Sequence, residues 1–259
     1  LNALVPCSRW GEQHKPFSAP AGILGNNVIS DPASVSIWFY ADQAFFTPEI
    51  GPGIALMPLV RRTIEYWLDR RMRSDAAGRP TGEITGYWDY GNFLDAEASP
   101  LIAAWDYVEA TGDLAWLARR IERLELVGGF LAGRDVDGDG LVEAIQSGDR
   151  GTLVQPNRSC SWWDALNCGH KDGYSNALIF RAWRSLADLE RMLGRAGKAE
   201  DWDRLAAATD LFVTVRGMTK GRAQTLSLDE DKTPMNRWDT DATGSELVFL
   251  TVPDGTRRL

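Results

Sequence analysis

Apolar residues recur at intervals of three and four along several stretches of the chain, the spacing that places side chains on one face of an α-helix. The clearest stretch repeats at steps of four, four, three and four: Leu178, Ala182, Leu186, Leu189 and Leu193. Gly194 follows at once and is suited to end a helix, because glycine readily adopts the left-handed conformation of a C-terminal cap. Residues 200–213 show the same spacing and are predicted to turn back on this helix as a hairpin.

A second helical hairpin is predicted in the middle of the chain. Pro100 is suited to open a helix that ends at Thr111, and Asp113 is placed to cap the next helix. We expect that next helix to end before Gly128, where two glycines stand together. A further amphipathic helix is predicted over residues 53–72.

Strand patterns are scarce, since only residues 141–145 and 226–252 are candidates and neither alternates strictly. The sequence therefore predicts an all-α fold built from helical hairpins. Long loops are expected at one end of the hairpins, and binding and catalytic residues are expected on those loops. We divide the chain into an unassigned entry segment (1–37), a helical-hairpin catalytic region (38–216) and an irregular, unassigned region (217–259).

Charge and hydropathy narrow the range of partners. The chain has 259 residues, 28 basic and 36 acidic, and a net charge of −8 without a basic stripe, so we expect no nucleic-acid partner. No apolar run approaches the roughly 18–20 residues that a membrane span needs. Three cysteines are an odd number, which excludes a disulfide framework as the source of stability.

Carboxylates are the candidate catalytic groups. The sequence has two histidines and contains no phosphate-binding glycine loop and no nucleophile elbow. Asp164 follows Trp162 and Trp163, and burial beside two indole rings would help a carboxyl group to hold a proton. Hydrolysis of a glycosidic bond uses such an acid with a second carboxylate. The alternative is that Asp164 caps a turn while the two tryptophans fill the core.

The segment around Asp164 and three other segments of the chain have the motifs of one group of enzymes. The Trp-Trp-Asp sequence at 162–164, followed by Ser-Asn-Ala-Leu at 175–178, resembles the six-hairpin glycosidases, such as trehalase, processing α-glucosidase I, glucoamylase, the debranching amylo-1,6-glucosidases and α-L-rhamnosidase. Segments 38–46, 94–113 and 135–143 are similar to further motifs of these enzymes and occur in the same order. The resemblance implies an (α/α)6 toroid of helical hairpins.

The resemblance also implies roles for individual residues. Asp164 would be the general acid, while Asp42 and Asp95 would contact sugar hydroxyl groups. Aromatic side chains would line the pocket, namely Trp38, Tyr40, Trp88, Trp162 and Trp163. His170 and Lys171 would be hydroxyl ligands, although residues of this kind are also common on the surface of loops.

One departure from the family concerns the general base. The family places its second carboxylate on a late hairpin, and residues 217–259 contain no match to that segment, with Glu246 the only late glutamate in a helix-like setting. We therefore expect an incomplete toroid that needs the rest of a longer chain or a partner subunit. The predicted function is hydrolysis of an α-linked oligosaccharide or glycoside with inversion. The alternative is a non-catalytic carbohydrate-binding toroid that lacks the base.

An acidic turn raises the question of a metal. Asp135, Asp137, Asp139 and Gly140 occupy positions 1, 3, 5 and 6 of a calcium loop, but position 12 is Gln146 and not a bidentate glutamate. We favour a tight turn in which Asp and Gly serve the backbone, and calcium remains the alternative. No catalytic metal and no other cofactor is expected.

Overall fold

The computed structural model describes residues 23–26, 31–33, 36–84, 94–143, 173–216, 218–219 and 222–223. These residues are mostly helical, which confirms the prediction of an all-α fold. The helices are α2 (Ile37–Phe46), α3 (Leu56–Tyr66), α4 (Leu94–Thr111), α5 (Leu114–Ala132), α6 (Gly173–Met192) and α7 (Ala196–Arg216), and a π-helical turn (Trp67–Arg71) continues α3.

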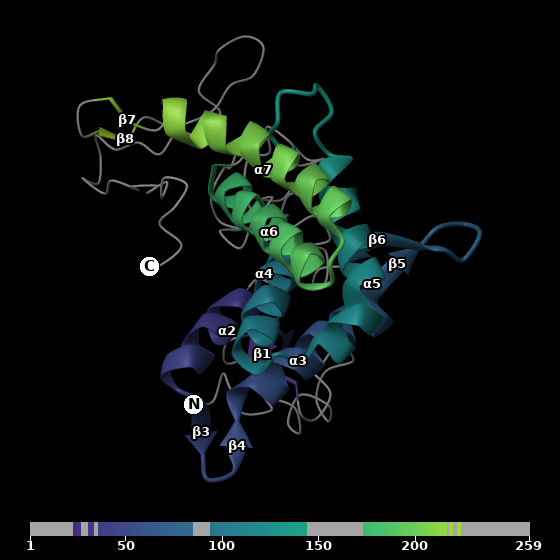
Figure 1. Ribbon diagram of the computed structural model, residues 1–259, viewed down its shortest axis with the longest axis vertical. Helices are drawn as coiled ribbons and strands as arrows, with labels where there is room; N and C mark the ends of the chain where they lie inside the picture. Colours follow the sequence, from purple (N-terminus) through teal and green to yellow (C-terminus); the bar gives the residue numbers. More distant parts are fainter. Residues whose placement is uncertain are drawn as a thin grey trace, which may run out of the picture.

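Short antiparallel ribbons accompany the helices. They are β1 (Gly25–Asn26) with β2 (Asp31–Pro32), β3 (Glu49–Gly51) with β4 (Ile54–Ala55), β5 (Met72–Ser74) with β6 (Pro80–Ile84), and β7 (Met218–Thr219) with β8 (Arg222–Ala223). The β5–β6 ribbon packs against α5 and projects from the side of the molecule (Figure 1).

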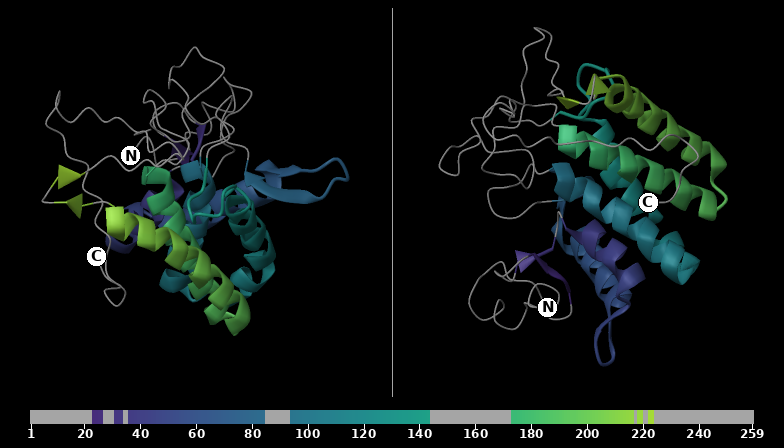
Figure 2. Two further views of the ribbon diagram at one scale, coloured as in Figure 1. Left: turned by 90° about the horizontal axis from the view of Figure 1, so that it is seen from above. Right: turned by 90° about the vertical axis from the view of Figure 1, so that its left-hand side faces the viewer.

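The helices form three hairpins whose first members lie in a row. Helix α4 packs against both α2 and α6, and each of these three helices packs against its successor, α3, α5 or α7. Figure 2 shows the row as stacked layers, with α4 between α2 and α6. We call α2, α4 and α6 the helix row. The two hairpins predicted from the sequence are α4–α5 and α6–α7.

A continuous apolar core joins the helix row to the second helices of the hairpins. Trp67, Trp116 and Trp183 are its largest fully buried side chains. The indole N–H of Trp116 donates a 2.9 Å hydrogen bond to Glu65, so this large apolar side chain is buried without an unpaired donor. Trp105 and Trp202 are partly buried against the same core.

Several helix boundaries differ from the sequence-based prediction, among them the start of α7 at Ala196 in place of residue 200. Helix α3 begins at Leu56, because the β3–β4 ribbon occupies the residues before it. Helix α4 begins at Leu94, and Pro100 lies inside it. Proline costs the helix one backbone hydrogen bond there, and burial of residues 94–104 offsets that cost.

Helix α5 likewise continues through Gly128 and does not end before it. An added Cβ at Gly128 would lie 2.7 Å from Leu186 of α6 and 3.0 Å from the ring of Trp202 on α7. This glycine therefore permits close packing of three helices, a requirement that the local sequence does not reveal.

Two helix ends agree with the prediction. The side chain of Asp113 accepts a 2.9 Å hydrogen bond from the backbone N–H of Trp116, as an N-terminal cap does. Gly194 has a φ of 73° and follows the end of α6. The candidate strand at 141–145 is wrong as far as residues 141–143, which form no strand, and residues 144–145 lie outside the described ranges.

No helix among the described residues is both long and apolar enough to cross a membrane. The candidate strand region at 226–252 lies outside the described residues.

Candidate functional site

Four of the site residues expected from the sequence lie in the described structure. Trp38, Tyr40 and Asp42 belong to α2, and Asp95 belongs to the first turn of α4. The other expected site residues lie outside the described residues: Trp88, Trp162, Trp163, Asp164, His170 and Lys171.

Tyr40 and Asp95 are enclosed by the protein. The hydroxyl of Tyr40 donates a 3.1 Å hydrogen bond to the carbonyl of Gly25, and its ring packs in the core. Asp95 is fully buried, and one of its carboxylate oxygens accepts a 3.0 Å hydrogen bond from the backbone N–H of Ala96.

Trp38 and Asp42 stand one helical turn apart on α2, so their side chains leave the same side of the helix. The backbone N–H of Trp38 donates a 3.1 Å hydrogen bond to the hydroxyl of Ser99, which ties the start of α2 to α4. Both side chains meet Arg181 of α6. The guanidinium carbon of Arg181 lies 5.5 Å from the centre of the Trp38 ring, within the range of a cation–π contact.

Arg181 holds the carboxylate of Asp42 with two nitrogens. Its Nη2 donates to Oδ1 of Asp42 at 2.9 Å and its Nη1 donates to Oδ2 at 3.3 Å. A two-point contact of this kind fixes the orientation of a carboxylate as well as its charge. The side chain of Asp42 remains 33% exposed, so part of it is still open to solvent.

A second carboxylate, Asp106 of α4, completes this arrangement. Its Oδ1 lies 3.6 Å from Nη2 of Arg181, and its side chain is only 1% exposed. Burial raises the pKa of Asp106 to about 7, Arg181 opposes that rise, and Asp42 adds to it. We call Trp38, Asp42, Asp106 and Arg181 the Asp42 cluster. It joins all three helices of the row.

Sequence reasoning missed Asp106 and Arg181. Each is a charged residue beside the apolar face of a well-defined helix, since Asp106 follows the apolar run 101–105 and Arg181 lies between Leu178 and Ala182. Charged side chains in such positions are seldom buried unless they are paired, and that is the signal that was available.

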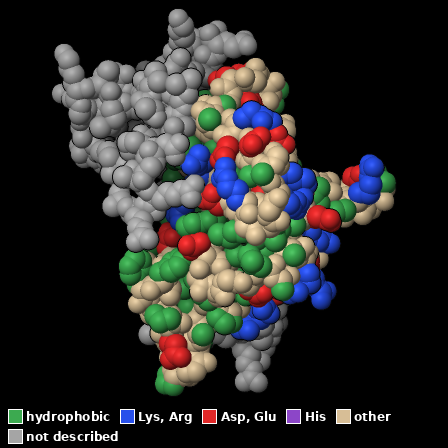
Figure 3. Space-filling model, viewed as in Figure 1, with side chains coloured by type: hydrophobic (Ala, Val, Ile, Leu, Met, Phe, Trp, Pro, Cys, Tyr) green, Lys and Arg blue, Asp and Glu red, His purple; other side chains and the backbone are tan. Residues whose placement is uncertain are grey.

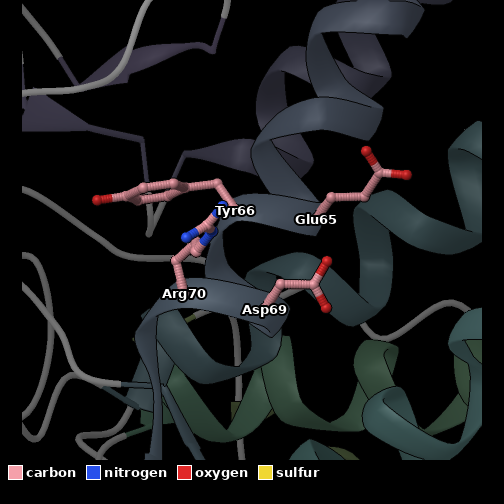
Figure 4. Close-up of a pocket in the computed structure, with 4 residues that line it drawn as sticks. All are labelled: Glu65, Tyr66, Asp69 and Arg70. Atoms are coloured by element: carbon pink, nitrogen blue, oxygen red, sulfur yellow. The ribbon is translucent and has the colours of Figure 1, made fainter.

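A surface hollow of about 410 Å³ lies at the end of α3 and is lined by Glu65, Tyr66, Asp69 and Arg70. Tyr66 and Arg70 extend to one side of the helix, and Glu65 and Asp69 to the other (Figure 4). Asp69 pairs with Arg120 at 2.7 Å. Both carboxylates bind side chains of α5, so they connect two helices.

The acidic turn brings three carboxylates together. Oxygens of Asp135, Asp137 and Asp139 lie within 4.8 Å of one another. The carboxylate of Asp135 also accepts hydrogen bonds from the backbone N–H groups of Gly138, Asp139 and Gly140, at 2.8, 3.1 and 3.0 Å. These hydrogen bonds are typical of a tight turn, in which an aspartate side chain accepts from backbone N–H groups a few residues further along the chain.

Comparison with known proteins adds no family. No family model matches the sequence, and no curated protein matches it either. Fold and site together define an α-helical protein of paired helices, with an aromatic ring, two carboxylates and one guanidinium gathered on its helix row.

Proposed function

We propose that this chain is part of a glycoside hydrolase that cleaves an α-linked glycosidic bond with inversion, with Asp164 as the general acid. The observation that carries the proposal is the placement of Trp38 and Asp42 on the same side of α2, where both contact Arg181. An indole ring with a fixed, partly exposed carboxylate beside it combines an apolar face with a hydrogen-bond acceptor. Sugars present a complementary combination of C–H faces and hydroxyl edges.

The helix row gives the proposal its architecture. In an (α/α)6 toroid, hairpins repeat around a ring, and the first helix of one hairpin packs on the first helix of the next. The contacts of α4 with α2 and α6 follow that scheme over three hairpins. We propose that the ring is completed by further hairpins, from the same protein or from a partner subunit, and that these supply the general base.

The test is release of free sugar from α-linked disaccharides and aryl α-glycosides, with the anomer followed by NMR. Asp164→Asn should reduce turnover of a disaccharide by several orders of magnitude and change sugar binding little, because proton donation matters in the transition state. The loss should be smaller with an aryl leaving group, which needs less protonation. Asp201→Asn, at an exposed position of α7, is the matched control and should retain turnover. The assay uses the protein together with the hairpins or the partner subunit that complete the ring, and a complete assembly that releases no sugar from any of these substrates would contradict the proposal.

A non-catalytic carbohydrate-binding protein is the second candidate. It is favoured by the absence of a match to the family's late carboxylate segment in residues 217–259. It predicts saturable binding of α-glycosides without release of sugar, and binding that Asp164→Asn leaves unchanged.

A further inference from the structure

We propose that Arg181 and Asp106 are positioning residues for Asp42: Asp106 is neutral, which leaves Arg181 free to hold the Asp42 carboxylate in place as an acceptor for ligand hydroxyl groups. The choice of a sugar as ligand rests on the proposed function. The charge state of the cluster and the contact between Arg181 and Asp42 do not.

The geometry favours Asp42 as the partner of Arg181. Both guanidinium nitrogens contact Asp42, at 2.9 and 3.3 Å, whereas Asp106 is approached by one nitrogen at 3.6 Å. The second oxygen of Asp106, Oδ2, is buried and has no hydrogen-bond partner among the described residues. An ionised carboxylate would leave that oxygen charged and unsolvated, at a high cost in free energy.

The charge balance leads to the same assignment. Two ionised carboxylates facing one guanidinium leave an excess negative charge in a partly desolvated place, and one proton removes it. Asp42 on α2 and Arg181 on α6 are the charged groups of the described residues that act on Asp106. Asp106 is the more deeply buried of the two acids, so it takes the proton, and Asp42 keeps the two-nitrogen contact with Arg181.

The arrangement is responsive to pH for a simple reason. When Asp106 loses its proton, it becomes a second anion beside Arg181 and competes with Asp42 for the guanidinium. Burial places this event near neutrality, with the pKa of Asp106 at about 7. A ligand that depends on the fixed carboxylate of Asp42 should therefore bind more weakly above neutral pH.

The first experiment needs no ligand. Side-chain carboxyl ¹³C NMR of the full chain should show an aspartate carboxyl that titrates near neutral pH and is lost in Asp106→Asn. The measurement is made in a Glu190→Gln background, because burial also raises the pKa of Glu190 to about 7. Arg181→Gln should move this titration to higher pH, since the guanidinium lowers the pKa of Asp106. Arg184→Gln is the control on the same helix and should leave it in place, because Arg184 pairs with Asp203.

Asp106→Asn retains the shape of a neutral carboxyl group and should fold. If it does not fold, the shift caused by Arg181→Gln still decides the question. An Asp106 carboxyl that titrates only in the ordinary aspartate range, or a titration that Arg181→Gln leaves unmoved, would overturn the proposal.

The second experiment measures binding of methyl α-D-glucopyranoside and methyl α-L-rhamnopyranoside between pH 5.5 and 8.5 by calorimetry. Wild-type affinity should fall on the order of tenfold as Asp106 ionises, the scale of one charge-assisted hydrogen bond. Asp106→Asn should bind equally well throughout. If binding by the wild-type protein does not change with pH, the positioning role of Arg181 and Asp106 is overturned. Absence of binding at every pH, with the carboxyl titration present, would contradict the proposed function and support the charge assignment.

Discussion

Gly82 of β6 lies directly against the backbone of Leu126 on α5, where an added Cβ would stand 2.0 Å from the Leu126 carbonyl oxygen. The glycine has a φ of 87°, a conformation that L side chains rarely adopt. Gly82→Ala should therefore push the β5–β6 ribbon away from α5 and lower the free energy of unfolding by about 3 kcal/mol. Urea unfolding followed by circular dichroism measures this loss.

Gly78, at the tip of the same ribbon, is the matched control. Its φ is 77°, and an added Cβ would meet nothing within 4 Å. Gly78→Ala should cost only the conformational strain, about 1 kcal/mol. If the two variants lose the same free energy of unfolding, the close approach of Gly82 to Leu126 contributes nothing to the cost of Gly82→Ala.

The cap at Asp113 offers a second test. One carboxylate oxygen accepts the N–H of Trp116, and the other accepts a 2.8 Å hydrogen bond from the hydroxyl of Tyr107, so the residue connects the end of α4 to the start of α5. Asp113→Ala should lower the free energy of unfolding by about 1–2 kcal/mol, and Asp113→Asn by less, because asparagine also caps helices. Urea unfolding of both variants checks this order, and an alanine variant as stable as the wild type would contradict it.

Asp113 also illustrates what the sequence could predict. Its capping position and the end of α6 at Gly194 depend on residues within one helical turn, so local pattern was sufficient. Gly128 was misread as a helix end because its role depends on Leu186 and Trp202, which are distant in the sequence.

The Asp42 cluster shows the same limit at the candidate site. Asp42 was expected to contact ligand, on the basis of a motif. Asp106 and Arg181 have no local motif, and only the packing of α2, α4 and α6 brings them to Asp42. Sequence reasoning therefore found the residue with a recognisable neighbourhood and missed the two that act through tertiary contact.

Stability should fall as the pH rises through neutrality because of Glu190. This glutamate near the end of α6 is fully buried, and burial together with the neighbouring Glu125 raises its pKa to about 7. The folded state thus binds a proton that the unfolded state releases near pH 4.5. The stabilisation is complete below that pH and is lost as the pH rises through 7.

The loss expected from Glu190 is about 2 kcal/mol between pH 5 and 8, measured by urea unfolding at each pH. Glu190→Gln should remove this part of the slope, because glutamine is neutral throughout, whereas Asp106, whose pKa burial also raises to about 7, should still contribute its own part. Nε of Arg195 lies 3.2 Å from Oε2 of Glu190. Its positive charge favours the ionised glutamate and should limit the loss of stability in the wild-type protein. A Glu190→Gln variant with the full wild-type slope would assign the pH dependence to another group.

The last prediction concerns an aromatic flank on α2, made of Phe39, Phe45 and Phe46. Their side chains are 48%, 47% and 83% exposed, and hydrophobic side chains gather on the lower part of the molecule, where α2 and the β3–β4 ribbon lie (Figure 3). Covering these three rings would contribute on the order of 5 kcal/mol, a large share of the net stability of a domain. A further hairpin packed on α2, as α2 packs on α4, would cover them.

The isolated chain should therefore self-associate through this flank. Light scattering should give a mass above the 28.7 kDa of one chain, and Phe39→Ser with Phe46→Ser should restore the single-chain mass without lowering the midpoint of thermal unfolding. Leu114→Ser, at a lone exposed leucine on α5, is the control and should leave the association unchanged. A wild-type chain that is monomeric at 28.7 kDa and releases sugar would contradict both the need for a covering hairpin and the proposal that the general base lies outside this chain.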